Sequence, residues 1–171
     1  MSGSFSEAPP VERPRTPDVA YGVPAEGGSM IGWAESIDRL RAAEAYWLAT
    51  TGPDRAPHVV PVWGVIVGDD LYLETGAPST KKARNLAAEP SVAVHLDGVN
   101  DALIVLGAAV ACRPDAALGG ALAAAFHAKY AGYTPGADDW DGGGLHRIEP
   151  RVMLAWRDMP TATRWRFPGR R

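Results

Sequence analysis

Cysteine is almost absent from this sequence: Cys112 is the single one among 171 residues, so no internal disulfide can form. A lone thiol is typical of a reducing compartment. Long apolar runs are absent as well, because the longest, residues 102–112, falls well short of the roughly 20 residues that a membrane-spanning helix needs. The N-terminus is polar and rich in proline rather than shaped like a signal peptide. We therefore expect a cytoplasmic protein without a membrane span.

An excess of basic charge is also missing. The formal net charge is −3, and the central residues 31–156 carry 10 basic against 15 acidic groups, which does not favour nucleic-acid binding. The histidines have no paired spacing of the kind that binds a metal, and we expect no metal site. Neither a Gly-x-Ser-x-Gly nor a phosphate-binding glycine loop occurs, and no helix pattern follows Gly142–Gly144, which we interpret as a flexible loop. The four histidines are His58, His95, His127 and His146.

Two regions differ in composition. Residues 1–30 contain five prolines and no apolar period, which predicts a flexible tail or an arm lying on another part of the protein. The whole chain is 46% hydrophobic and of ordinary domain size, and we expect one domain over residues 31–171.

Hydrophobic periodicity predicts seven strands and three helices in that domain. Strands clustered in this way, with few helices between them, favour a mainly β fold, a closed antiparallel barrel with peripheral helices. Gly119 and Gly120 lie inside the third helix, where paired glycines allow close packing against another element. The predicted strands are 46–51, 58–67, 71–75, 91–96, 103–111, 145–156 and 163–167, and the predicted helices are 34–44, 79–89 and about 118–130.

The start of the second helix carries an unusual charge. Lys81, Lys82 and Arg84 crowd its first turns, where the helix dipole is already positive, and Ser79 is the predicted N-cap. An anion such as a phosphate would relieve this repulsion, held by backbone N–H groups, the lysines and nearby hydroxyls. The alternative is a solvated helix end with a chance basic cluster. The hydroxyls are those of Thr75, Ser79 and Thr80.

A second unusual stretch is the strand around Pro61. Pro61 cannot donate a ladder hydrogen bond and Gly64 has no side chain, yet both lie in a strongly β-like run. A bulge or an edge position would explain this. A functional alternative is that the backbone here faces a flat ring, with Trp63 packing beside it. A ring on this strand and a phosphate at the helix start would fit one phosphorylated ligand.

Five stretches of the chain, taken in order, resemble a known family. They are Ala56–Trp63, Leu71–Thr75, Thr80–Leu86, Pro90–Val94, and Ala155–Trp156 together with Ala162–Phe167. In this order and spacing they are similar to the split β-barrel flavin and deazaflavin oxidoreductases related to pyridoxamine 5′-phosphate oxidase. The resemblance covers residues 35–167 and implies an FMN-binding type of split β-barrel.

This resemblance also implies a cofactor site. It makes residues 60–63 (Val60, Pro61, Val62 and Trp63) a backbone wall on the cofactor ring, and Glu74 and Thr75 neighbours of the ribityl chain. It puts Lys81 and Lys82 on the phosphate, beside Ser79, Thr80 and Asn85. It implies a homodimer with the cofactor at the subunit interface. Residues near the C-terminus then contact the cofactor of the same or the other subunit: these are Trp156 and Arg166, with Arg164 an equally good contact.

The chain departs from the oxidase pattern near its C-terminus. Thr163–Arg166 stands where an Arg-Leu-His substrate motif is expected, which disfavours vitamin B6 oxidation. The motifs are closer to the branch that uses coenzyme F420, which implies hydride transfer to a small organic acceptor without an acid–base pair of the protein. Acceptor contacts are expected from the loop 133–144. The alternatives are an FMN-dependent oxidoreductase and a non-catalytic protein that binds flavin, F420 or haem.

Overall fold

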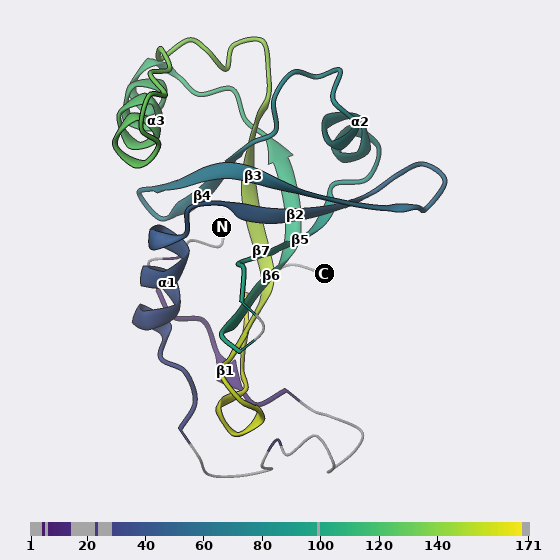
Figure 1. The fold of residues 1–171 in the computed structure, drawn as a ribbon, viewed down its shortest axis with the longest axis vertical. Coiled ribbons are helices and arrows are strands. Elements are labelled where there is room, and N and C mark those ends of the chain that lie inside the picture. The colour runs from purple at the N-terminus through teal and green to yellow at the C-terminus, as the bar shows by residue number, and fades with distance from the viewer. Residues whose placement is uncertain (1–4, 6, 15–22, 24–28, 99, 169–171) are drawn as a thin grey trace.

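The computed structural model describes residues 5, 7–14, 23, 29–98 and 100–168 (Figure 1). Its centre is a closed barrel in which every strand pairing is antiparallel. The ring runs β7-β4-β3-β2-β5-β6 and closes by the pairing of β6 with β7. Outside the ring, β8 pairs with the second half of β7, and β1 pairs with β8. The strands are β1 (Val11–Glu12), β2 (Tyr46–Thr51), β3 (Pro57–Val67), β4 (Asp70–Glu74), β5 (Ser91–His95), β6 (Ala102–Ala111), β7 (Leu145–Trp156) and β8 (Thr163–Arg166).

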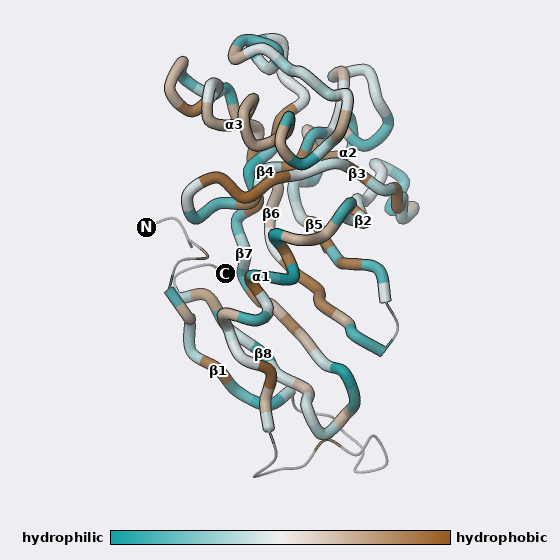
Figure 2. The backbone as a smooth tube through the Cα atoms, turned by 60° about the vertical axis from the view of Figure 1, so that its left-hand side comes forward, coloured by the Kyte–Doolittle hydropathy of each residue, from teal (hydrophilic) through white to brown (hydrophobic). Residues whose placement is uncertain are grey.

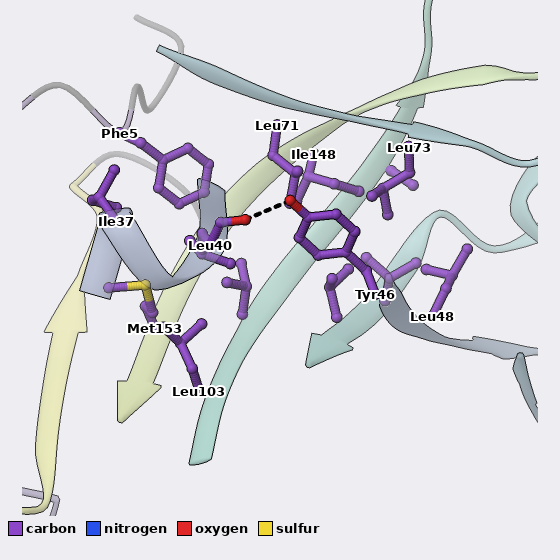
Figure 3. Close-up of a cluster of buried hydrophobic side chains, with 14 of the residues drawn as sticks. Phe5, Ile37, Leu40, Tyr46, Leu48, Leu71, Leu73, Leu103, Ile148 and Met153 are labelled. Carbon is purple, nitrogen blue, oxygen red and sulfur yellow. Dashed lines mark hydrogen bonds between the residues drawn. The ribbon is translucent and has the colours of Figure 1, made fainter. Parts of the chain in front are cut away.

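The barrel interior is the main hydrophobic core. Alternate residues of each strand point inward, as in β2, where Tyr46 and Leu48 are fully buried. Helix α1 (Trp33–Ala42) packs on this core through Ile37 and Leu40, and the Tyr46 hydroxyl donates a 2.6 Å hydrogen bond to the Leu40 carbonyl (Figure 3). Hydrophobic residues run along the strands and hydrophilic residues gather at several of the turns (Figure 2).

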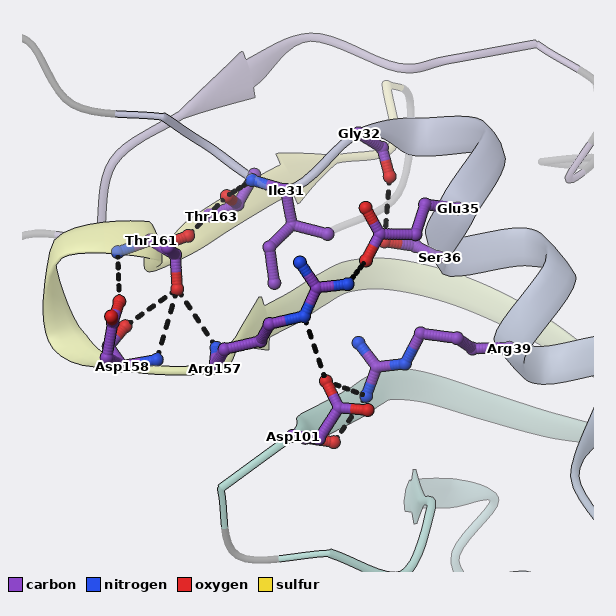
Figure 4. A network of polar contacts seen from close by, with 10 residues as sticks. All are labelled: Ile31, Gly32, Glu35, Ser36, Arg39, Asp101, Arg157, Asp158, Thr161 and Thr163. Atoms are coloured by element: carbon purple, nitrogen blue, oxygen red, sulfur yellow. Dashed lines mark hydrogen bonds and ion pairs between the residues drawn. The ribbon is translucent and has the colours of Figure 1, made fainter.

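An ionic network holds α1 against the far end of the barrel (Figure 4). The Arg39 guanidinium lies 3.1 Å from a carboxylate oxygen of Asp101, at the start of β6. Arg157, just after β7, contacts both Asp101 and Glu35 of α1. Three elements that are distant in sequence are thereby linked, and the position of the chain that leaves α1 toward β2 is set.

Helix α3 (Ala116–Lys129) covers the outside of β3 and β4 and forms a second hydrophobic cluster. Leu122 and Phe126 are fully buried there against Val65 and Tyr72. Helix α2 (Lys81–Ala88) packs near β2 through Leu86. All three predicted helices and all seven predicted strands are present, with bounds that differ by a few residues.

Part of the region predicted as a flexible tail is instead packed on the barrel. Phe5 is 2% exposed, stacks on Trp33 with ring centroids 6.3 Å apart, and meets Phe167 edge-on. The two residues of β1 pair with β8. These residues match the second of the two predicted possibilities, an arm that lies on another part of the protein. Burial of one aromatic ring and a short strand pairing outweigh the proline-rich composition. Residues 1–4, 6, 15–22 and 24–28 lie outside the described residues.

The two glycines of α3 offer a matched pair of substitutions. A Cβ at Gly119 would lie 2.3 Å from the Ala137 carbonyl oxygen, whereas one at Gly120 would have nothing within 4 Å. We expect Gly119→Ala to lower the free energy of unfolding by about 1 to 3 kcal/mol through overpacking. Gly120→Ala should raise it by about 0.5 to 1 kcal/mol, because alanine favours the helix. Urea denaturation of both variants tests this, and changes of the same sign would contradict the packing described.

Candidate functional site

A cleft of about 320 Å³ opens between β3, the end of β4 and the start of α2. At this point β3 changes partner: residues up to Val62 pair with β2, and residues from Trp63 onward pair with β4. Pro61 lies just before the change, where its missing N–H interrupts no pairing with β4. The unusual strand composition thus coincides with the cleft. Its lining residues are Ala45, Pro61, Val62, Trp63, Glu74, Gly76 and Lys82.

Five of the predicted cofactor residues therefore line one cleft, although they come from three elements: Pro61, Val62, Trp63, Glu74 and Lys82. Trp63 and Glu74 are direct partners in the β3–β4 ladder, which places their side chains on the same face. Val60 is half-buried and packs on the barrel core, so it is not among the lining residues.

The N-terminus of α2 differs from the prediction by one residue. Thr80, not Ser79, is the N-cap: its hydroxyl accepts a 3.3 Å hydrogen bond from the Ala83 N–H and donates to the Thr75 carbonyl at 3.1 Å. The Ser79 carbonyl instead accepts a hydrogen bond from the Arg84 guanidinium. The hydroxyl of Thr80 is thus already used, and Ser79 is exposed outside the cleft lining.

The basic residues of α2 are not equivalent. Lys82 is half-buried and lines the cleft, whereas Lys81 is exposed and does not. No acidic residue lies in the first turn of this helix, so nothing in that turn offsets the positive end of its dipole. A helix start of this kind, next to a lysine in a cleft, favours an anionic ligand group.

Two predicted ligand contacts, Thr75 and Asn85, are buried within the protein instead. The Thr75 hydroxyl is fully enclosed, 3.1 Å from the Gly144 carbonyl and 3.0 Å from the His146 ring nitrogen Nδ1. Asn85 is 2% exposed and donates a 3.0 Å hydrogen bond to the Thr50 hydroxyl. Both residues join α2 and β4 to neighbouring strands, so they shape the cleft without facing it.

Two tyrosines that the sequence prediction missed, Tyr130 and Tyr133, contact residues that line the cleft. Tyr130 stacks on Trp63 with ring centroids 4.7 Å apart, and its hydroxyl hydrogen bonds to the backbone of Gly64. The Tyr133 hydroxyl donates a 2.8 Å hydrogen bond to the Glu74 carboxylate. Burial raises the pKa of Glu74 above its usual value, although this hydrogen bond opposes the rise. The aromatic spacing of Phe126 and Tyr130 on α3 was the available signal.

Lys129, at the end of α3, is half-buried against β3, the strand that lines the cleft. Its Nζ donates to the Gly64 carbonyl at 2.8 Å and to the Tyr46 hydroxyl at 3.1 Å, and lies over the rings of Tyr46 and Tyr130. Burial disfavours the ammonium ion and lowers the pKa of Lys129 from its ordinary 10.5 to about 8.

This shift predicts a pH dependence of stability. Between about pH 8 and 10.5 the unfolded chain binds more protons at Lys129 than the folded one, so stability should rise with pH in that window. After allowance for solvent screening, we expect a rise of about 1 to 2 kcal/mol from this group. Denaturation at pH 7.5 and 10 tests it against Lys129→Met, which should lack this part of the rise. Parallel pH profiles for the two proteins would contradict it.

Three predicted contacts near the C-terminus lie at the end of the barrel away from the cleft. They are Trp156, Arg164 and Arg166. Trp156 ends β7, whereas Leu145, at the start of β7, pairs with Glu74 beside the cleft. Arg164 and Arg166 of β8 both pair with the Glu12 carboxylate of β1, Arg164 Nε at 2.7 Å (Figure 1 shows β1 far from α2). None of these three residues therefore reaches the cleft of its own chain.

The outer surface of the sheet next to the cleft is apolar. Val59, Trp63 and Leu106 are 48%, 45% and 38% exposed. The ladder register places Trp47 beside Pro61, Ala49 beside Val59, and Ala93 beside Leu106. We call this outward surface of β3, β2, β5 and β6 the apolar face; Pro61 and Trp63 belong both to it and to the cleft.

No group of three or more His, Cys, Asp or Glu side chains in the described ranges is arranged to hold a metal ion. Among the helices that the structure describes, none is long and apolar enough to cross a membrane.

A six-stranded antiparallel barrel with three helices defines a split β-barrel protein. The family model for pyridoxamine 5′-phosphate oxidase matches residues 34–157, and the chain belongs to this family. The family resemblance and the fold class predicted from the sequence are therefore confirmed. None of the curated proteins matches the chain.

Solved structures with a similar fold include proteins of several kinds. The conserved hypothetical protein Rv2991 from Mycobacterium tuberculosis is 25% identical, with a TM-score of 0.63 over 78% of this chain and 89% of that one. A protein described as an F420 reductase is 27% identical, with a TM-score of 0.50 over 66% and 90%. HutZ, the heme storage protein from Vibrio cholerae, is 17% identical, with a TM-score of 0.56 over 71% and 90%, and shows the fold alone.

Proposed function

We propose that this protein is a cytoplasmic F420-dependent oxidoreductase that transfers a hydride to a small organic acceptor. The observation that carries the proposal is the cleft in which Lys82, beside the start of α2, lies near the partner change of β3. Its volume of about 320 Å³ is at the lower end of the usual range for ligand sites. The similarity to a protein described as an F420 reductase supports the deazaflavin over FMN.

Each lining residue would have a distinct part in binding. Lys82 and the free N–H groups of α2 would hold an anionic group of the cofactor, and the backbone at Pro61 and Val62 would lie along its ring. Trp63, fixed by Tyr130, would limit how far the ring can tilt and would exclude water from one side. F420 supplies the hydride when bound, so no acid–base pair of the protein is needed.

We further propose a homodimer in which the cofactor lies at the subunit interface. Support comes from the apolar face, whose exposed residues a second copy would cover, and from its continuity with the cleft through Pro61 and Trp63. Trp156 and Arg166 of a second copy could then reach a cleft that they do not reach in their own chain. Sedimentation of the purified protein as a monomer at micromolar concentration would contradict this.

Fluorescence-quenching titrations with F420 and, separately, FMN test the cofactor. Tight F420 binding with weak FMN binding would support the proposal and justify an assay of acceptor reduction. The reverse order would favour an FMN-dependent oxidoreductase of the same fold. Tight binding without turnover of any acceptor would favour a cofactor-binding protein without catalysis, and a Soret band after addition of haem would favour a haem-binding one. Binding of none of these groups would overturn the proposal.

A further inference from the structure

A second cleft, of about 350 Å³, adjoins the first on the side of the loop after α3. The two share Glu74 and Gly76, so a ligand in one lies beside a ligand in the other. Loop residues 133–144, where acceptor contacts were expected, provide most of the wall of the second cleft. Its lining residues are Glu74, Gly76, Ala77, Pro78, Tyr133, Asp139, Trp140, Gly142, Gly143 and Gly144.

Backbone contacts, a hydrogen bond and aromatic packing hold the wall of this second cleft in place. Gly144 has φ +96°, and a Cβ there would lie 2.7 Å from the Gly76 carbonyl oxygen, so the two loops meet backbone to backbone. The Thr75 N–H donates a 2.7 Å hydrogen bond to the Gly144 carbonyl. Trp140 is 2% exposed and packs on Phe126 of α3. The Gly142–Gly144 stretch, interpreted from sequence as a flexible loop, is therefore fixed at Gly144.

The charged groups of the second cleft are acidic. Glu74 and Asp139 line it, whereas Lys82 lines the first cleft and not the second. Tyr133 already donates its hydroxyl hydrogen to Glu74, so the cleft offers oxygen acceptors and an aromatic ring but few side-chain donors. Carboxylates and an aromatic face attract organic cations and repel anions.

We propose that the second cleft binds a planar organic cation, such as an N-alkylated pyridinium ring, held by Glu74, Asp139 and the ring of Tyr133. The inference rests on the proposed function only in that this ligand would then be the hydride acceptor. A cationic ring that accepts a hydride gains one C–H bond and its electron pair and becomes neutral, so the acceptor takes up no proton. The reduced cofactor gives up the hydride and releases one proton to solvent as it returns to its oxidised form. The two clefts thus separate an anion-binding from a cation-binding ligand site.

Three matched probes test the charge preference: 1-methylnicotinamide, which is a cation, neutral nicotinamide and anionic nicotinate. Each is titrated into the full chain without cofactor and followed by ligand-detected NMR. We expect 1-methylnicotinamide to bind about 5 to 10 times more tightly than nicotinamide, and nicotinate to bind most weakly. Equal affinity for the three probes, or no binding of the cation, would overturn the proposal.

Two variants locate the binding. Asp139→Asn should weaken 1-methylnicotinamide binding about two- to fivefold, the scale of an exposed ion pair. Asp38→Asn, an exposed acid on α1 away from the cleft, is the matched control and should leave the affinity unchanged. Equal effects of the two variants would contradict the assignment. Because no cofactor is present, failure here leaves the F420 titration untouched, and failure of F420 binding leaves this result standing.

Discussion

Lys82→Ala should weaken F420 binding about 10- to 150-fold, which corresponds to about 1.5 to 3 kcal/mol for one charge-assisted hydrogen bond. Lys82 is the one basic residue among those that line the first cleft, and it lies one residue into α2, where free N–H groups add to its effect. The measurement is the quenching titration with the variant and the unaltered protein side by side. Circular dichroism checks that the barrel remains folded.

Lys81→Ala is the matched control, because it removes the same charge from the neighbouring position. Lys81 is exposed and outside the cleft, so its loss should act only through screened electrostatics and cost under about fivefold. Raising the salt concentration should reduce the effect of Lys81→Ala more than that of Lys82→Ala. Equal losses for both variants would remove Lys82 from the site and favour a diffuse basic surface.

A second large effect is expected from Leu122→Ala, at about 2 to 5 kcal/mol of unfolding free energy. Leu122 is fully buried between α3 and the outer side of β3 and β4, where Phe126 and Trp140 leave little freedom to close a cavity. Urea denaturation gives the difference. Leu118→Ala, on the same helix but half-buried, is the control and should cost clearly less. A loss below about 1 kcal/mol at Leu122 would mean that α3 is not anchored as described.

The regular part of the fold follows closely from the sequence. The stretch Tyr46–Thr51 predicts its strand because it is rich in aromatic and β-branched residues and ends at a Gly-Pro-Asp turn. The strand β1 was missed because two residues among prolines carry no period, and its formation depends on β8, more than 150 residues later. The glycine pair of α3 predicted close packing, and the structure identifies Gly119 as the residue that requires it.

The residues of the candidate site are harder to predict from the sequence than the strands and helices of the fold. Lys82 and Trp63 could be proposed because local features, a basic helix start and a proline in a strand, point to them. Thr75 and Asn85 have the same polar chemistry, but their hydrogen-bond partners come from β7 and β2, which only the barrel brings near. Tyr133 was not selected, because no local period marks its pairing with Glu74 across 59 residues.

The place of β7 in the barrel bears on how the chain folds during synthesis. β7 pairs with β4, β6 and β8, yet its first residue, Leu145, leaves the ribosome only after β4 and β6 have been synthesised. Until then the edges of β4 and β6 that pair with β7 have no partner, and β1 has none until β8 is synthesised. Unpaired edges invite wrong pairing with other chains. Nascent chains stalled before residue 145 should therefore engage chaperones more than chains that include β7 and β8.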